Sequence, residues 1–214
     1  MSEAVERQVP RPARKPRSDG ERSRQAILRE AAQLATVEGI DGLSIARLAD
    51  AVGMSKSGLY AHFGSKEELQ LATIEAANRL FDKYVVEPAA AAATGIEGLQ
   101  ALTENYLRYV EGRIFAGGCF FASLVAEMDT QQGPVRDRAL AFMDDWMRRL
   151  EAAVRTAQAE GAIAASEDPG QLAFELEAIV FLANAQFVLA QGSEPIDRAR
   201  RALERRLRAA SSGG

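Results

Sequence analysis

SKSGLYAHF, at residues 55–63, predicts a short helix with one apolar side and one side of small residues. At about 100° per residue, Leu59 and Phe63 lie together and face a core. The opposite side carries only short side chains, so another molecule can come close to the helix backbone. The residues on that side are Ser57, Gly58 and Ala61.

The segments before this helix place it in a larger unit. Ser44 is positioned to cap a preceding helix over residues 45–52, whose apolar residues recur at helical spacing. Gly53 then supplies a tight turn, and Ser55 caps the next helix. A helix, a glycine-containing turn and a second helix form the helix-turn-helix arrangement, in which the second helix enters the major groove of DNA. We therefore predict that the helix after Ser55 meets DNA bases.

Side chains beside the groove-facing surface are expected to reach phosphates. Lys56 and Tyr60 fall on one flank of the predicted recognition helix and His62 on the other. Arg47 points away from the buried side of the preceding helix. Taken singly, Tyr60 fits a half-buried aromatic residue and His62 a surface histidine. Their combination with the caps and glycines favours DNA binding.

The longer stretch GIDGLSIARLADAVGMSKSGLYAHFGSKEEL, residues 39–69, resembles the DNA-binding signature of the TetR family of bacterial transcriptional regulators. The match covers residues 22–71 and includes Gly53 and Phe63. By this resemblance, phosphates are contacted by Ser44, Tyr60, His62 and Lys66. The residues nearest the bases are by the same resemblance Ser55, Lys56, Ser57 and Gly58.

The resemblance also implies a mode of action. The protein is expected to be a homodimeric repressor that binds an inverted-repeat operator in double-stranded DNA, with half-sites about one helical turn or somewhat more apart. A small hydrophobic or cationic effector is expected to release it. An activator or a ligand-independent DNA-binding protein would share the same N-terminal unit.

Charge is distributed unevenly along the 214 residues, whose formal net charge is -4. Residues 1–66 hold 11 Lys and Arg against 8 Asp and Glu, whereas residues 67–214 hold 15 against 22. The basic, proline-containing residues 1–17 cannot bury enough apolar surface to fold alone, so we expect a disordered tail. This tail is either a solvated extension or an arm that follows phosphates or enters a minor groove.

The rest of the chain predicts helices, which makes the fold class all-α with about nine helices. The first helix is predicted over residues 18–39, opened by Ser18 and Glu21 as a capping box. A fourth, long helix begins after Ser65 and breaks at Glu87 and Pro88. Further helices are predicted over residues 96–115, 119–129, 134–161, 168–190 and 193–209. The expected domains are a basic tail (1–17), a helix-turn-helix domain (18–65), a ligand-binding and dimerisation domain (66–209) and a flexible tail (210–214).

An aromatic and methionine-rich stripe follows Cys119 and carries one carboxylate. Core packing is the commoner use of such a stripe. The alternative is a ligand pocket in which Glu127 pairs with a cation or accepts a hydrogen bond. The candidate ligand-binding residues are Tyr106, Phe120, Leu124, Glu127, Met128, Met143, Trp146, Met147 and Phe181.

The last two predicted helices carry apolar residues around more of their circumference than one core needs. This pattern predicts a bundle formed with a second copy of the chain, with arginines on its outer side. The candidate dimerisation residues are Phe174, Ala178, Ala185, Phe187, Val188, Ala199 and Leu203.

An enzyme is not expected. The chain has one histidine, inside the helix-turn-helix, and one cysteine, Cys119, so neither a Cys–His nucleophile nor a Cys/His zinc site assembles readily. No phosphate-binding glycine loop or nucleophile elbow occurs, and no cofactor or metal is predicted.

A second version of the regulator uses Cys119 as a sensor of oxidants or electrophiles, although a cysteine beside two phenylalanines is more often a small buried residue. The sequence also predicts a cytoplasmic protein without a membrane span. Its longest mostly apolar run, residues 178–190, is shorter than the roughly 20 residues a span needs.

Overall fold

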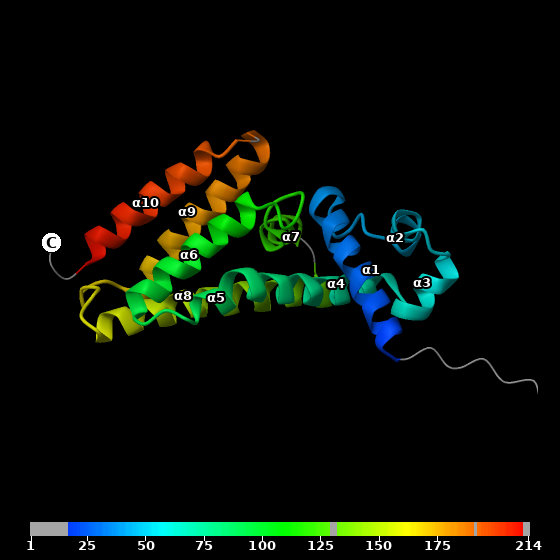
Figure 1. Cartoon of the computed structure of the whole chain (residues 1–214), viewed down its shortest axis with the longest axis horizontal. Coiled ribbons are helices and arrows are strands. Elements are labelled where there is room, and N and C mark those ends of the chain that lie inside the picture. The colour runs from blue at the N-terminus through cyan, green and yellow to red at the C-terminus, as the bar shows by residue number, and fades with distance from the viewer. Residues whose placement is uncertain (1–16, 129–131, 191, 212–214) are drawn as a thin grey trace, which may run out of the picture.

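The computed structural model describes residues 17–128, 132–190 and 192–211, with side chains from residue 20 onward. These ranges are helical, and they contain no β-strand beyond an isolated bridge between Ile163 and Ser211. The predicted all-α class is confirmed. Figure 1 shows the N-terminal helices at one end of the molecule, joined by a long helix to a larger bundle.

The N-terminal unit consists of α1 (Arg17–Glu38), α2 (Ile45–Val52) and α3 (Lys56–Phe63). Ser44 and Ser55 cap α2 and α3, as predicted, by accepting backbone N–H bonds at their hydroxyls. Gly53 ends α2 in the left-handed region at φ 67°, where a residue with a Cβ would be strained. The predicted capping role of Ser18 lies outside the described side chains.

The connecting helix is longer and less regular than predicted. It runs as α4 (Lys66–Phe81), a π-helical turn η1 (Asp82–Val86) and a short α5 (Glu87–Ala89). The predicted break at Glu87 and Pro88 is wrong, because the π turn lets the helix continue through the proline. Pro88 is the second residue of α5 and follows the π turn directly, and the backbone is helical on both sides of it.

The larger bundle contains α6 (Gly95–Glu111), α7 (Phe120–Met128), α8 (Pro134–Ala159), α9 (Pro169–Ala190) and α10 (Glu194–Ala210). The predicted extension of α6 to Phe115 is wrong, since the helix ends at Gly112 and Arg113 takes a positive φ of 47°. Figure 1 shows α10 lying along α9 on the side of the bundle away from α4 and α8.

Aromatic rings fill the junction of the connecting helix and the bundle. Phe81, in the last turn of α4, makes edge-to-face contacts with five other rings. Such pairs contribute about 0.5–1.5 kcal/mol each beyond the area they bury. The surrounding rings come from α6, α7 and α8 and belong to Tyr106, Tyr109, Phe121, Phe142 and Trp146.

α9 is the most apolar of the long helices of the bundle. By length and composition alone it is sufficient to cross a bilayer, and 39% of its most apolar 18-residue window is buried in this single chain. A core helix has the same composition, and α9 packs against α6, α8 and α10. On its buried side, Asn184 accepts a hydrogen bond from the backbone N–H of Cys119 at 2.7 Å. The rest of its apolar surface faces outward.

Two glycines of α6 test how closely this bundle is packed. A Cβ at Gly95 would lie 2.4 Å from the backbone nitrogen of Ala157 in α8, whereas a Cβ at Gly98 would meet only Ala92 at 3.9 Å. We expect Gly95→Ala to lower the free energy of unfolding by about 2 kcal/mol through overpacking. Gly98→Ala is the matched control and should raise it by about 0.5–1 kcal/mol. Urea unfolding of both variants measures the difference, and equal effects would contradict the close α6–α8 contact.

Candidate functional site

The hydroxyls at the start of α3 are already engaged within the helix. Ser55 accepts the N–H of Gly58 at 3.1 Å and shares a hydrogen bond with the Ser57 hydroxyl at 3.2 Å. A Cβ at Gly58 would lie 3.2 Å from the Ser55 oxygen, so glycine keeps this first turn open. Leu59 and Phe63 are buried, and Ser57 and Ala61 are exposed on the other side, as the helical spacing predicts.

Two of the predicted flank residues extend freely from α3. The Tyr60 side chain is 55% exposed. Lys56 is exposed and has no hydrogen bond or ion pair among the described residues. His62 is half-buried, with its ring 6.0 Å from that of Phe63. Sequence reasoning missed Arg24 of α1, whose guanidinium lies 5.0 Å over the Phe63 ring; a basic residue early in the first helix was the available signal.

The other two predicted basic contacts have partners inside the protein. Lys66 donates from Nζ to the backbone carbonyl of Asp41 at 2.7 Å. Arg47 forms an ion pair with Glu38 of α1, which lowers the pKa of the carboxyl through hydrogen bonding. Both residues remain predicted DNA contacts. Each has further N–H donors, so a phosphate contact would share the charged group with its protein partner or replace that partner.

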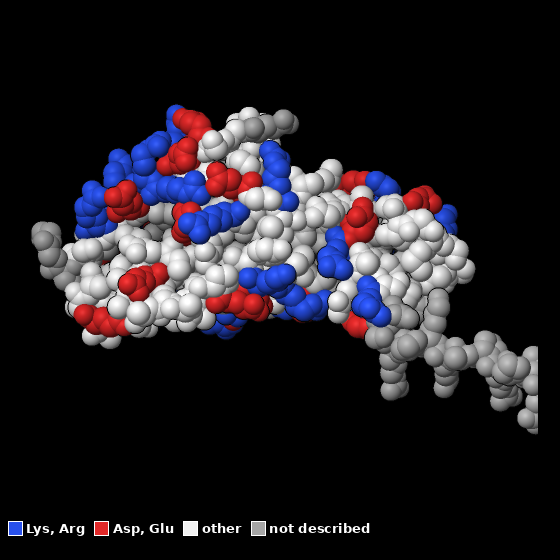
Figure 2. Space-filling view, in the orientation of Figure 1, with Lys and Arg blue, Asp and Glu red and all other residues white. Residues whose placement is uncertain are grey.

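The helix-turn-helix itself carries little net charge. Residues 18–66 hold six Lys and Arg against six Asp and Glu, so the positive charge of the N-terminal region comes from residues 1–17. Figure 2 shows a largely uncharged surface over α3, while the Lys and Arg visible on this face are densest over α10 and others are scattered along the middle of the molecule. Attraction to DNA phosphates therefore depends on a few residues of this unit and on the basic N-terminal segment.

Predicted ligand-binding residues lie mostly in the interior of the bundle. Glu127 does not, because both of its oxygens accept backbone N–H groups of the turn between α1 and α2. Met143, Met147 and Phe181 are partly buried and pack against the core. The fully buried members of the set are Tyr106, Phe120, Leu124, Met128 and Trp146.

Sequence reasoning missed the carboxylate that does lie beside these rings. Glu177 of α9 accepts a hydrogen bond from the Trp146 indole N–H at 2.6 Å. Its desolvation raises the pKa of the carboxyl to about 7, partly offset by the indole bond. The Tyr109 hydroxyl, on a ring that contacts Phe81 and Phe115, is buried with no hydrogen-bond partner among the described residues. Only the helical spacing of Glu177 with the apolar residues of α9 could have indicated its position.

Cys119 is buried at the start of α7 and is 2% exposed. Burial raises the pKa of its thiol, which keeps the unreactive protonated form at neutral pH. The sensor version of the regulator is therefore not supported by the environment of this cysteine.

Two family models match the chain. One, described as "Bacterial regulatory proteins, tetR family", covers residues 27–73, and one described as "Tetracyclin repressor-like, C-terminal domain" covers residues 95–203. The chain belongs to the tetR family. It is therefore a DNA-binding transcriptional regulator, and its relatives are regulators, not enzymes.

Individual relatives agree with this assignment. The transcriptional regulator AcuR of Cereibacter sphaeroides is 27% identical over 159 residues, which cover 72% of this chain and 71% of AcuR. A TetR transcriptional regulator from Chloroflexus aurantiacus J-10-fl superimposes with a TM-score of 0.84 at 26% identity, covering 91% of this chain and 98% of its own. AibR, solved with isovaleryl coenzyme A and operator DNA, shares the fold, with a TM-score of 0.68 at 24% identity over 88% of this chain and 98% of AibR.

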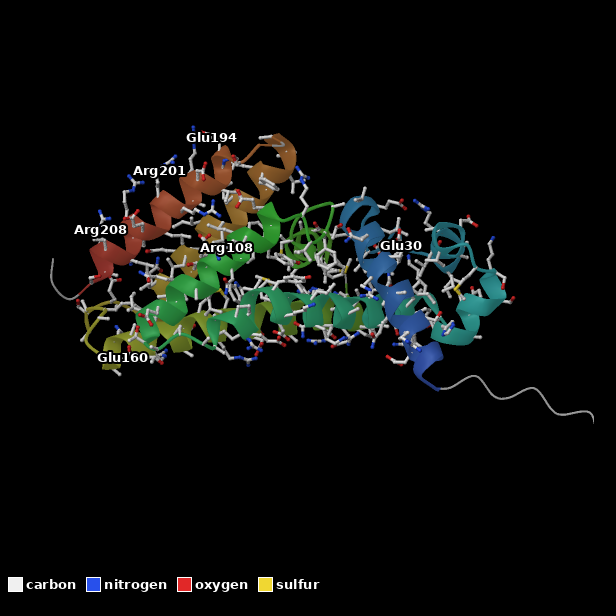
Figure 3. All side chains as sticks on the ribbon, viewed as in Figure 1. Glu30, Arg108, Glu160, Glu194, Arg201 and Arg208 are labelled. Carbon is white, nitrogen blue, oxygen red and sulfur yellow. The ribbon has the colours of Figure 1, made fainter. Side chains whose placement is uncertain are left out.

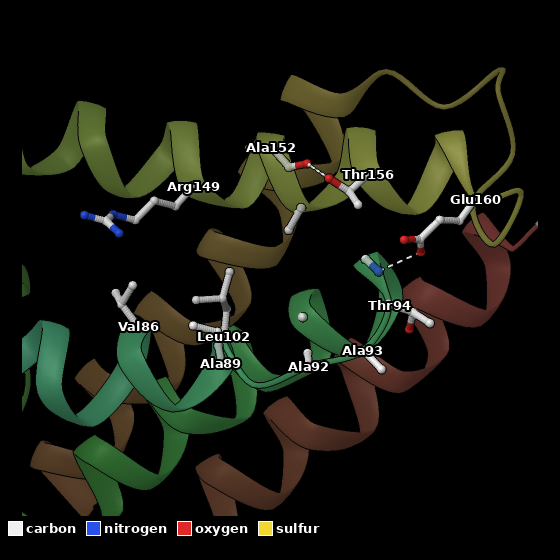
Figure 4. A pocket seen from close by; sticks show the side chains of 14 residues that line it. Val86, Ala89, Ala92, Ala93, Thr94, Leu102, Arg149, Ala152, Thr156 and Glu160 are labelled. Carbon is white, nitrogen blue, oxygen red and sulfur yellow. Dashed lines mark hydrogen bonds between the residues drawn. The ribbon is translucent and has the colours of Figure 1, made fainter.

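An open, mostly apolar pocket lies at the end of the bundle away from the helix-turn-helix of this tetR-family protein. It has a volume of about 420 Å³ and is lined by η1, α5, α6 and α8 (Figure 4). Arg149 and Glu160 are its charged residues, and Glu160 accepts the N–H of Gly95 at 2.7 Å. None of the predicted ligand-binding residues lines this pocket.

The predicted dimerisation residues divide into two groups. Phe187, Ala199 and Leu203 are buried within the single chain. An outward stripe on α9 includes Phe174, Leu182 and Leu189, which are 63%, 57% and 83% exposed. Leu182 and Leu189 belong to the apolar pattern that predicts dimerisation by this helix, although they are not among the candidate dimerisation residues. Ala178 and the half-buried Ala185 continue this stripe at helical spacing, and Val188 is half-buried beside it.

Arginines of α10 fall on two sides of the helix. The inner ones, Arg200 and Arg206, hold α10 on the bundle through carboxylates of α6 and α9 and of the segment before α9. Arg201 and Arg208 point outward in Figure 3. The predicted basic outer side of the last helix is therefore present.

Lys56 and Lys66 give a paired test of the DNA-binding surface. Lys56 has no partner within the described protein, so we expect Lys56→Ala to leave thermal stability unchanged. It should weaken DNA binding and reduce the salt slope of log K by about 1, as loss of one phosphate contact does. Lys66→Ala removes a bond to Asp41 and should also lower the melting temperature. Fluorescence anisotropy at several salt concentrations measures both slopes, and an unchanged slope for Lys56→Ala would exclude it as a phosphate contact.

Proposed function

We propose that the protein is a homodimeric repressor that binds an inverted-repeat operator and is released by a small hydrophobic or cationic effector. The observation that carries the proposal is the open, small-residue face of α3, held on a body whose interior contains polar groups among aromatic rings. Two copies would place their α3 helices in successive major grooves, so the operator half-sites should be about one helical turn or somewhat more apart.

The interior of the bundle supports the effector class. Aromatic faces attract cations, and a carboxylate beside them adds charge complementarity. Trp146 and Tyr106 stack with centroids 6.2 Å apart, and Glu177 bonds to the Trp146 indole. The unpartnered Tyr109 hydroxyl offers a further polar group. AibR, a protein of this fold, has been solved with an acyl thioester and DNA.

Release by an effector has a thermodynamic condition. A ligand changes the DNA-binding equilibrium only to the extent that it binds the two conformations with different affinity. In this protein the buried rings around Phe81 join the connecting helix to the bundle. A ligand that separates these rings would change the orientation of α4 relative to the bundle.

A footprint on DNA upstream of the protein's own gene tests the proposal. We expect protection of an inverted repeat at moderate salt, with two protected half-sites on one face of the duplex. A thermal-shift screen of hydrophobic and cationic compounds should then find one that stabilises the protein and also releases DNA. Absence of any protected inverted repeat would reject the repressor proposal.

The outward stripe of α9 is the expected dimer contact. Leu182→Glu places a charge at its centre, and we expect sedimentation to show a monomer at concentrations where the unmodified chain is a dimer, because burying an unpaired charge is costly. Leu182 is 57% exposed in the single chain, so the helix content should be retained. Val37→Glu is the control, since Val37 is equally prominent at 66% exposure but lies on α1. A dimer that survives Leu182→Glu would place the interface elsewhere.

The raised pKa of Glu177 predicts a pH dependence of stability. With a pKa of about 7 when folded and a usual value of 4.5, the buried neutral acid stabilises the fold fully below pH 4.5. That contribution is lost as the pH rises through 7. Glu177→Gln stays neutral and should gain stability relative to the unmodified protein between pH 5 and pH 8, by about 2 kcal/mol after allowance for partial exposure.

Thermal unfolding across this pH range measures the Glu177 effect. The matched control is Glu175→Gln. Glu175 lies two positions before Glu177 on α9, and its pKa is lowered chiefly by its hydrogen bonds to Gln171 and Arg206. Its carboxyl is ionised in both the folded and the unfolded state between pH 5 and pH 8, so the stability difference between Glu175→Gln and the unmodified protein should stay constant there, whereas that of Glu177→Gln should grow with pH. Parallel stability curves for Glu177→Gln and the unmodified protein would contradict the raised pKa.

A further inference from the structure

The turn between α1 and α2 is held by a residue of the bundle. Glu127, in the last turn of α7, accepts the backbone N–H of Ile40 at Oε2 and that of Asp41 at Oε1, both at 2.7 Å. Glu127 is more than 80 positions away in sequence from both Ile40 and Asp41. A charged acceptor makes such bonds about twice as strong as neutral ones, and this carboxylate binds two adjacent amides at once.

The backbone of the turn is shaped to receive this carboxylate. Gly39 has a φ of 82°, and a Cβ at this position would lie 2.8 Å from Oε1 of Glu127. Glycine therefore serves two purposes here: it adopts the left-handed conformation that ends α1, and it leaves space for the carboxylate. A side chain in place of Gly39 would have to displace Glu127.

The same turn is tied to α4 from another side. Gln70 donates to the carbonyl of Ile40 at 2.8 Å, and Lys66 donates to the carbonyl of Asp41 at 2.7 Å. Carbonyl groups of the turn thus bond to α4, while its N–H groups bond to α7. The bonds to α4 stay within the N-terminal region and its connecting helix, whereas the bonds of Glu127 join the turn to the bundle.

We propose that Glu127 is a positioning residue for DNA binding, which sets the place of the helix-turn-helix relative to the bundle. Ser44 caps α2 directly after the turn, so a shift of Ile40 and Asp41 moves α2 and, through Gly53, α3. A second contact is made by α1, where Gln33 bonds to both Ile114 and Ala116 of the α6–α7 loop. That contact holds the middle of α1, and Glu127 holds the turn next to the DNA-reading helices.

Distance measurement within one chain tests the proposal without DNA or effector. Spin labels are attached through Asp50→Cys on α2 and Gln100→Cys on α6 in a Cys119→Ala background, and the labelled protein is diluted with unlabelled protein so that most assemblies contain one labelled chain. Both labelled positions are exposed. We expect one narrow distance with Glu127 present. Glu127→Gln places an amide NH₂ against a backbone N–H and should add a second population at another distance.

Glu160→Gln is the matched control. Glu160 also accepts a backbone N–H at 2.7 Å, from Gly95, but both residues belong to the bundle, so this bond does not join the bundle to the helix-turn-helix. It should leave the label distance unchanged. Glu127→Asp is a second variant, for use if Glu127→Gln folds poorly. It keeps the charge but shortens the side chain, and we expect a distance distribution between those of Glu127→Gln and the unmodified protein.

Operator affinity gives a second readout, and this part alone rests on the proposed function. Glu127→Gln should bind the operator about tenfold more weakly than the unmodified protein, within the usual range of coupling between sites, and Glu160→Gln should bind normally. An unchanged distance distribution in Glu127→Gln, or an equal change in Glu160→Gln, would overturn the positioning role. Absence of operator binding by the unmodified protein would instead reject the proposed function and leave the distance result standing.

Discussion

The edge-to-face contacts of Phe81 are the constraint on which the rest of the structure depends. This single ring, at the end of α4, lies among aromatic residues of α6, α7 and α8. Aromatic pairs of this kind prefer specific angles, so the connecting helix cannot rotate or slide without disturbing several of them. The π turn that follows at Asp82–Val86 adjusts the helix to this fixed point. The orientation of the helix-turn-helix, at the other end of α4, therefore depends on this junction as well as on the hydrogen bonds of Glu127.

Recognition of DNA by this protein cannot rest on α3 alone. Ser57, Gly58 and Ala61 provide one hydroxyl and apolar surface, and the Ser57 hydroxyl already shares a hydrogen bond with Ser55. They lack the paired donors and acceptors with which Arg, Asn or Gln identify a base. Because residues 18–66 carry no net charge, electrostatic attraction is also weak in this unit. In the proposed dimer we therefore expect the spacing between the two α3 helices and the shape of the DNA, together with Lys56, to carry much of the specificity.

The sequence predicted local features better than tertiary ones. Caps at Ser44 and Ser55 and the turn at Gly53 depend on a few adjacent residues, and these features were confirmed. The end of α6 depends on the loop that Gln33 holds from α1, more than 80 residues away, and it was predicted wrongly. The two glutamates show the same limit. Both Glu127 and Glu177 lie among apolar residues at helical spacing, and only the packing of α7 and α9 decides that one contacts the first turn and the other the aromatic interior.

The short helix α7 connects these two regions physically. Its first turn carries Phe121, which contacts the Phe81 ring, and its last turn carries Glu127, which holds the turn before α2. A nine-residue helix is about 13 Å long and moves as one body. A displacement of the backbone at Phe121 would therefore be passed on to Glu127. The bonds from Glu127 are short and made to backbone groups, so the turn must follow the carboxylate or lose two hydrogen bonds. Under the proposed mechanism, either result would change the place of α2 and α3, and a rearrangement among buried rings would in this way reach a surface that those rings never touch.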